Sequence, residues 1–112
     1  MISKKLVAAS AAPLILSILS RGESYGYAII QRVGELSGGE MTWNEGMLYP
    51  VLHRMERDGW IRAEWGSSEH GRRRKYYFIE PKGQAALDAE RAEWAVVHNA
   101  LSHLWGAAPC PS

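Results

Sequence analysis

Residues 44–56 read NEGMLYPVLHRME, and their pattern predicts a helix with one apolar face. Asn44 is a good N-cap, and Gly59 lies where a glycine would stop the helix. The apolar positions recur at helical spacing, and they are Leu48, Val51, Leu52 and Met55. The residues that point away from this stripe are candidates for contact with a partner: Glu45, Tyr49, Pro50, His53, Arg54 and Arg57.

Two further helices are expected before this one. Apolar residues at spacings of one, three and four predict a first helix from Ala12, with Pro13 in its first turn. Ser24 is expected to cap a second helix that ends at Gly38 and Gly39. The apolar side of that second helix is expected to consist of Tyr25, Ala28, Ile29, Val33 and Leu36.

Length and composition indicate one soluble globular domain. The 112 residues are 46% hydrophobic and 22% charged, which is typical of globular chains. The 13 Lys and Arg residues nearly balance the 12 Asp and Glu residues, so the net charge of +1 does not by itself indicate nucleic-acid binding. The single cysteine, Cys110, excludes an internal disulfide framework and fits a reducing cytoplasm.

The N-terminal segment imitates a signal peptide. Lys4 and Lys5 precede a mostly apolar run from Leu6 to Leu19. The run is shorter than the roughly 20 apolar residues that a membrane span needs, and its only cleavage-like site lies inside it. We therefore expect a core helix and no membrane segment.

The hydrophobic period changes to two after Gly59. Ile61, Ala63 and Trp65 alternate with charged residues, which predicts a strand with one buried face. Residues 66–71 have turn composition, and residues 72–79 form a second strand that is basic at its start and aromatic at its end. Pro81 opens a last helix, in which Leu87, Trp94 and Leu101 fall seven residues apart. Val97 and Leu104 lie three residues after Trp94 and Leu101, and Glu90 interrupts this coiled-coil-like pattern.

Three helices followed by a hairpin is the order of a winged helix, whose third helix enters the DNA major groove. Seven of the 13 basic residues lie between Arg54 and Lys75, on the two elements that would contact DNA. Phosphate binding needs such a concentration of positive charge. The alternative is a solvated basic hairpin that only protects a sheet edge from aggregation.

The sequence resembles the PadR-type transcriptional regulators. The resemblance covers about residues 12 to 105, and its specific motifs are the Tyr-Gly-Tyr at Tyr25 to Tyr27 and the Gly-x-Leu-Tyr-Pro-x-Leu pattern at Gly46 to Leu52. Further matching stretches are Leu14 to Leu16, Ala28-Ile29, His53 to Glu56 with Gly59, Arg73 to Tyr77, and Gly83. Met47 departs from the family's usual Thr or Ser and lacks its phosphate-binding hydroxyl, and Glu80 replaces a Thr that would cap the last helix better.

The resemblance implies a mainly α fold with a β-hairpin, a winged helix-turn-helix plus a C-terminal dimerisation helix, as in the short subfamily. Residues 1–80 would form the DNA-binding domain, residues 81–105 the dimerisation helix, and residues 106–112 a disordered tail. We expect a cytoplasmic, dimeric repressor that binds a pseudo-palindromic operator in double-stranded DNA, with no cofactor and no enzymatic activity. Some members of the short subfamily are similar in binding flat aromatic drugs between protomers, which implies a small planar effector here.

The expected DNA-binding residues lie on the second and third helices and on the wing. Arg54 can form a bidentate bond to guanine, whereas the wing residues are expected to hold phosphates. Tyr49 either contacts DNA or packs under the wing, and Glu45 is either turned aside or reads cytosine. The full set is Tyr25, Tyr49, His53, Arg54, Arg57, Arg73, Arg74 and Lys75.

The last helix is expected to form the dimer and the effector site. The interface residues are Leu87, Trp94, Val97, Leu101 and Leu104, and the ligand-binding residues are Trp94 and Trp105. Glu90 would pair with a cationic ligand or with Arg91 of the partner subunit. A constitutive DNA binder without an effector, and a small-molecule or protein binding module, remain alternatives. His98 and His103 would lie roughly 140° apart on one helix, which disfavours a metal site.

Overall fold

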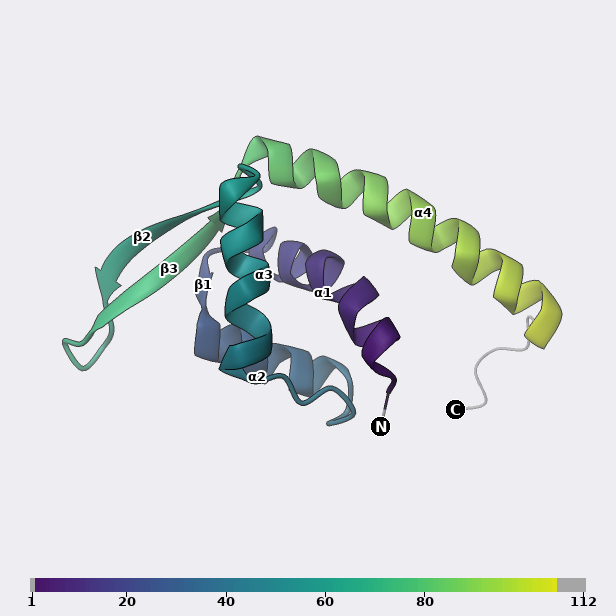
Figure 1. Cartoon of the computed structure of the whole chain (residues 1–112), viewed down its shortest axis with the longest axis horizontal. Helices are drawn as coiled ribbons and strands as arrows, with labels where there is room; N and C mark the ends of the chain where they lie inside the picture. Colours follow the sequence, from purple (N-terminus) through teal and green to yellow (C-terminus); the bar gives the residue numbers. More distant parts are fainter. Residues whose placement is uncertain (1, 107–112) are drawn as a thin grey trace.

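The computed structural model of the chain describes residues 2–106. The disordered tail predicted for residues 106–112 therefore lies, apart from Gly106, outside the described residues. The elements run in the order α1 (Lys4–Leu19), β1 (Ser24–Tyr25), α2 (Gly26–Leu36), α3 (Glu45–Arg57), β2 (Ile61–Ser67), β3 (Arg73–Ile79) and α4 (Pro81–Trp105). Figure 1 shows α1, α2 and α3 grouped together, with the β2–β3 hairpin projecting to one side and α4 extending to the other.

Helix α3 has the bounds and the buried face that its sequence predicts. The Asn44 side chain accepts a hydrogen bond from the Met47 backbone N–H at 2.9 Å, which caps the helix. Leu48, Leu52 and Met55 are buried. Gly59 follows the helix with a φ of 78°, a conformation that glycine adopts without strain. The predicted cap and stop signal are thus confirmed, and so is the stripe, except that Val51 is only partly buried.

Helix α1 begins at Lys4, so the prediction of a start at Ala12 is wrong. The Ser3 hydroxyl accepts a hydrogen bond from the Leu6 backbone N–H at 3.2 Å and caps the helix. Pro13 consequently lies inside the helix rather than in its first turn. The alanine-rich residues before Pro13 favour helix strongly enough to offset the one backbone hydrogen bond that proline cannot donate. Among the described residues, no helix is both long and apolar enough to cross a membrane.

Ser24 does not cap α2 as predicted but pairs in a third strand. Strand β1 lies antiparallel to β3, with Ser24 opposite Tyr77 and Tyr25 opposite Tyr76, so the sheet order is β1-β3-β2. The pairing gives the backbone groups on the open edge of β3 a partner. Helix α2 then begins at Gly26 with no side-chain cap. Its last residue, Leu36, is 54% exposed rather than turned inward.

The β2–β3 hairpin has a buried face only where it lies next to the helices. Its register runs from Ile61 opposite Ile79 to Ser67 opposite Arg73. Ile61 is buried, but Trp65, which was expected on the same buried face, is 61% exposed. The outer half of the hairpin extends beyond the helices (Figure 1), so neither of its faces packs against the helical core there.

Helix α4 begins at Pro81, as predicted, and Glu80 precedes it without forming a side-chain cap. Gly83 contacts the backbone carbonyl oxygen of Trp60 so closely that a Cβ atom would collide with it. Leu87 is buried in the core of its own chain. The start of α4 is therefore fixed to the winged-helix core, whereas residues 91–100 are all exposed.

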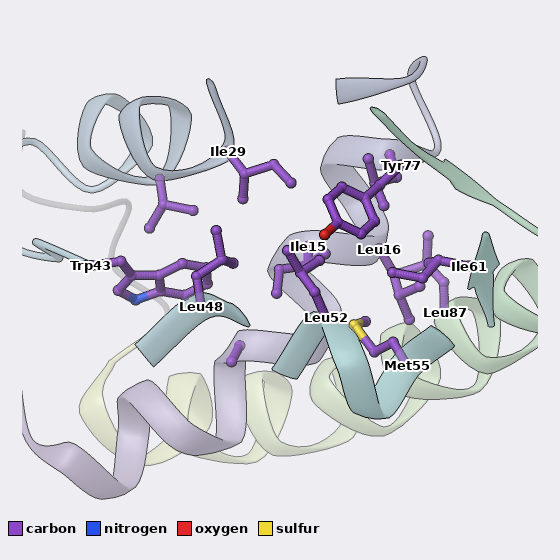
Figure 2. Packing of buried hydrophobic residues seen from close by; sticks show 13 residues of the cluster. Ile15, Leu16, Ile29, Trp43, Leu48, Leu52, Met55, Ile61, Tyr77 and Leu87 are labelled. Carbon is purple, nitrogen blue, oxygen red and sulfur yellow. The ribbon is translucent and has the colours of Figure 1, made fainter. Parts of the chain in front are cut away.

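Tyr77 lies in the centre of the core with its hydroxyl group buried (Figure 2). The residue is 1% exposed, and its hydroxyl oxygen has no hydrogen-bond partner within the described residues. Burial, together with smaller effects of Tyr49 and Glu56, raises the pKa of Tyr77 to about 12. The folded chain therefore holds this proton more tightly than the unfolded chain does.

The free energy of unfolding is expected to fall between pH 10 and pH 12 because of Tyr77. An unfolded tyrosine titrates near pH 10, so its stabilising contribution is complete below pH 10 and is lost as the pH rises through 12. The gap between the folded and unfolded pKa values of Tyr77 corresponds to a loss of at most about 3 kcal/mol in the free energy of unfolding. Urea unfolding across this range should show a smaller fall in the free energy of unfolding for Tyr77→Phe than for the wild type. Equal falls in Tyr77→Phe and in the exposed control Tyr27→Phe would contradict the assignment.

Candidate nucleic-acid interface

The outward face of α3 offers side chains that the rest of the chain leaves accessible. Arg54 forms no ion pair or hydrogen bond with any described residue and is exposed. Arg57 lies 3.3 Å from the Asp58 carboxylate, but its side chain is 71% exposed. The His53 ring stands beside the Tyr49 ring, with centroids 6.4 Å apart. The exposed members of this face are Glu45, Pro50, His53, Arg54 and Arg57.

Tyr49 is half-buried and packs against the start of α2. Its hydroxyl group lies so close to the Gly26 Cα that any side chain at residue 26 would collide with it. Tyr49 was expected either to contact DNA or to pack under the wing. The packing contact found is with Gly26 of α2, and contact with DNA stays a prediction. The contact joins the start of α2 to the first half of α3.

Aromatic rings hold the wing arginines without neutralising them. The Arg73 guanidinium lies 4.7 Å from the centroid of the Trp65 ring, and that of Arg74 lies 3.7 Å from the Tyr25 ring. The Tyr25 ring meets the Tyr76 ring edge to face, with the two centroids 5.7 Å apart. A cation stacked on a ring keeps its charge and its in-plane N–H donors. Arg73 and Arg74 are thus oriented but still able to bind an anion.

Two other basic residues of the hairpin are engaged by carboxylates. The Lys75 Nζ lies 3.7 Å from a Glu56 carboxylate oxygen. Arg62 pairs with Glu64 at 2.8 Å and with Glu80 at 3.5 Å, and the hydrogen bond with Glu64 is the main reason that its pKa is raised. Arg62 is therefore paired with carboxylates at the base of the wing. Lys75 is paired with Glu56 of α3.

A groove of about 400 Å³ lies between the start of α2, the start of α3 and the wing. We call it the basic groove, and its lining residues are Tyr25, Gly26, Tyr27, Glu45, Tyr49, Trp65, Arg73, Arg74 and Lys75. It brings together the expected residues of the first turns of α3 and of the wing. His53, Arg54 and Arg57 lie outside its lining, further along α3.

Sequence reasoning missed Tyr27 and Trp65 as groove residues. Tyr27 is 63% exposed, with its hydroxyl group accepting a hydrogen bond from Gln31 at 2.9 Å. Trp65 had been assigned to a buried face. The pairing of an aromatic residue with an arginine near the tip of a hairpin is the signal that could have placed Trp65 on the surface.

Trp94 packs against α1 in the single chain. A hollow of about 210 Å³ next to it is lined by Ser10, Pro13, Leu14, Ser17 and Trp94. The indole N–H of Trp94 donates a hydrogen bond to Glu90 at 3.1 Å, so this carboxylate is engaged within its own helix. Trp94 is 38% exposed even so.

Three of the apolar residues that follow Trp94 in the predicted interface or ligand site are mostly exposed in the single chain. Val97 is 51% exposed, Leu104 82% and Trp105 77%, while Leu101 is half-buried. We call Trp94, Val97, Leu101 and Leu104 the α4 seam. His98 and His103, on the same helix, are exposed, and within residues 2–106 no three His, Cys, Asp or Glu side chains come together as a metal site.

Comparisons with known proteins agree with this arrangement. The transcriptional regulator PadR-like family matches residues 15–89. The transcriptional regulator YqjI of Escherichia coli is 32% identical over 83 residues, which are 72% of this chain but only 33% of that protein. This chain thus spans about a third of the length of YqjI.

Two solved structures are similar to most of this chain. A PadR-like transcriptional regulator from Bacillus cereus is 28% identical, with a TM-score of 0.82 over 92% of this chain and 98% of that one. A PadR family regulator from Clostridium difficile is 32% identical, with a TM-score of 0.76 over 87% of this chain and 99% of that one. In both cases the likeness extends over more than four fifths of this chain.

Proposed function

Because the chain belongs to the PadR-like family of transcriptional regulators, we propose that it represses transcription as a homodimer bound to a pseudo-palindromic operator in double-stranded DNA. Helix α3 enters the major groove, and the wing contacts the neighbouring phosphates. The observation that carries this proposal is the set of accessible cations on these two elements. Arg54 on α3 has no ion pair among the described residues. Arg73 and Arg74 are held on the wing by aromatic rings.

The homodimer forms through the α4 seam. Leu87 packs in the core of its own chain, so the interface begins at Trp94. Exposed apolar side chains spaced along one side of a helix gain free energy when a second copy covers them. A two-fold axis between two α4 helices places the two α3 helices on half-sites about 34 Å apart, or a multiple of that distance.

The wing residues hold phosphates rather than read bases, and this is tested by salt dependence. Arg73→Gln or Arg74→Gln should weaken binding to all duplexes alike. Each should lower the magnitude of the slope of log K against log salt concentration by about 1 per protomer. Fluorescence anisotropy with labelled duplexes from 50 to 200 mM salt measures the slope.

The matched control for the wing is Arg62→Gln, because Arg62 is engaged by Glu64 and Glu80 at the base of the hairpin. It should leave the slope unchanged. A change of slope in Arg62→Gln as large as in Arg73→Gln would show that the wing arginines have no special role.

A small planar effector binds between the protomers, next to Trp94 and Trp105. The partly exposed ring of Trp94 and the exposed ring of Trp105 supply stacking surfaces near the seam. Titration with the planar dye Hoechst should quench tryptophan fluorescence, and Trp94→Phe should abolish most of the quenching. Quenching that survives in Trp94→Phe, or no binding by a panel of planar compounds, would leave a constitutive DNA binder.

A further inference from the structure

One face of the β2–β3 hairpin is turned toward α3. Side chains two residues apart in a strand point to the same face, and so do side chains directly opposite on paired strands. Trp65 lies opposite Lys75, and Arg73 precedes Lys75 by two residues, so all three share one face. The Lys75 Nζ lies 3.7 Å from a carboxylate oxygen of Glu56 on α3, and Tyr77, the next residue of this face, is buried in the core. We call it the α3 face of the hairpin.

The opposite face of the hairpin carries Arg74. Arg74 and Tyr76 alternate with the residues of the α3 face along β3, and Tyr25 of β1 lies opposite Tyr76. The ring contacts agree with this placement, because the Tyr25 ring meets both the Tyr76 ring and the Arg74 guanidinium. A Cβ atom at Gly66, which lies opposite Arg74, would likewise meet the Tyr76 ring. We call this side the outer face.

Arg73 and Arg74 also lean in opposite directions within the sheet. Both belong to β3, the central strand of the order β1-β3-β2. Arg73 stacks on Trp65 of β2, whereas Arg74 stacks on Tyr25 of β1. The two guanidinium groups therefore diverge, both between the faces of the hairpin and between the strands that flank β3. Such a pair suits two separate phosphates rather than a single one.

The basic groove reaches the wing at the edge of β3. Arg73, Arg74 and Lys75 all line it, although successive side chains belong to different faces. Strand β1 pairs with only Tyr76 and Tyr77, so among the described residues no strand lies beside the three cations on that side. A DNA backbone next to this edge can therefore be contacted from either face of the hairpin.

We propose that Arg73 and Arg74 bind phosphates of opposite DNA strands across one minor groove, a step that rests on the proposed function. With α3 in the major groove, the hairpin, which projects beyond the helices, meets the adjoining minor groove (Figure 1). That groove is about 6 Å wide in B-DNA and has one phosphodiester backbone on each side. A hairpin that enters it turns one face to each backbone, so arginines on opposite faces contact different strands.

The orientation of the α3 face decides which strand each arginine holds. One backbone separates the major groove that α3 occupies from the minor groove that the wing occupies. Arg73, on the α3 face, is turned toward this backbone, which we call the near strand. Arg74, on the outer face, is turned toward the backbone on the other side of the minor groove, which we call the far strand.

Trp65 and Tyr25 act as positioning residues in this arrangement. Each ring holds one guanidinium on its own face and leaves the charge and the in-plane N–H donors free for a phosphate. A side chain that is already ordered loses less conformational entropy when it binds. The rings therefore strengthen the phosphate contacts through the arginines.

Neutralisation of single phosphates tests the assignment of strands. The probe is the duplex that the purified full chain enriches from a random library, with phosphates replaced one at a time by uncharged methylphosphonates. Replacement of a contacted phosphate in one half-site should weaken wild-type binding about tenfold, as loss of one charge-assisted hydrogen bond implies. The sensitive positions beside the α3 site should include one on each strand, facing each other across one minor groove.

Each arginine variant should lose sensitivity on one strand. Arg73→Gln should lose a sensitive position on the near strand alone, and Arg74→Gln should lose one on the far strand alone. Arg62→Gln is the matched control and should keep both positions, because Arg62 lies on the outer face but is paired with Glu64 and Glu80. Loss on the same strand in both variants, or a wild type with no sensitive position on the far strand, would overturn the assignment of strands.

Trp65→Leu tests the positioning role. Trp65 is 61% exposed and lies outside the core cluster, so leucine there leaves the core intact. The variant should weaken binding about two- to fivefold, the strength of an exposed cation–π contact, and should lower sensitivity on the near strand only. Trp65→Phe keeps a ring and should restore most of both. In the Arg73→Gln background, Trp65→Leu should cause no further loss.

The remaining outcomes separate the two levels of the proposal. Equal loss of sensitivity on both strands in Trp65→Leu, or a loss that adds to that of Arg73→Gln, would overturn the positioning role. An enriched duplex on which both arginines hold one strand overturns the strand assignment alone. If the chain enriches no duplex at all, the proposed function fails, and the strand assignment fails with it.

Discussion

Replacing Val97 and Leu104 by glutamate is expected to turn the dimer into monomers and to lower operator affinity by about 10² to 10⁴ fold. The two side chains are 51% and 82% exposed in the single chain, so the substitutions remove no contact within the core. In the dimer they place four carboxylates in an apolar interface, where burying unpaired charge is costly. A monomer reaches one half-site and loses the gain in effective concentration that the second half-site provides.

Sedimentation equilibrium and anisotropy with an operator duplex measure both parts of this prediction. Val96→Glu is the matched control, because Val96 is 69% exposed but lies about 100° around the helix from Val97. Substitution is preferable to a chain that ends at Lys82, which would also remove Gly83 and Leu87 from the folded core. A double variant that still sediments as a dimer and keeps its operator affinity would disprove dimerisation through the α4 seam.

Arg54→Ala is expected to weaken operator binding by about 1 to 3 kcal/mol in each half-site, and thus by about 2 to 6 kcal/mol in the dimer. The loss should be concentrated at one base pair of each half-site, because a bidentate bond to guanine discriminates against every other base. Arg54 forms no ion pair or hydrogen bond with another residue between 2 and 106, so its replacement breaks no such bond within that part of the chain.

A panel of operators with single base-pair changes measures this specificity. Wild-type protein should discriminate at the position that Arg54 reads, and Arg54→Ala should bind all four base pairs there nearly equally. Arg73→Gln is the control and should weaken every member of the panel alike. If the wing variant changes sequence preference while Arg54→Ala does not, the roles of α3 and the wing are reversed.

Local signals predicted the parts of the fold that depend on few neighbours. The limits of α3 follow from Asn44 and Gly59, and its buried face follows from helical spacing, so the structure confirms both. The start of α4 likewise follows from Pro81. In these segments the capping, the periodicity and the stop signal all favour the same structure.

The failures concern features that depend on distant residues. Strand β1 is two residues long and exists because β3 lies beside it, so it has no periodicity of its own. Trp65 is exposed because the hairpin extends past the helices, which no local pattern encodes. Pro13 was read as the beginning of a helix that in fact starts at Ser3 and Lys4.

The candidate interface was predictable in its residue types but not in its contacts. The basic run at Arg73 to Lys75 predicted a charged wing. Only the three-dimensional arrangement shows that Tyr25 and Trp65 hold two of these cations while Glu56 holds the third. Such contacts depend on strand register and on the packing of β1, both of which are set by tertiary structure.

The most direct measurement of the central claim is selection of binding sites from a random duplex DNA library by the purified protein. The account predicts enrichment of a pseudo-palindromic sequence, with half-site centres about 34 Å apart or a multiple of that distance, and two protomers bound per duplex. Recovery of no common sequence, or of a single asymmetric site bound by one protomer, would contradict it.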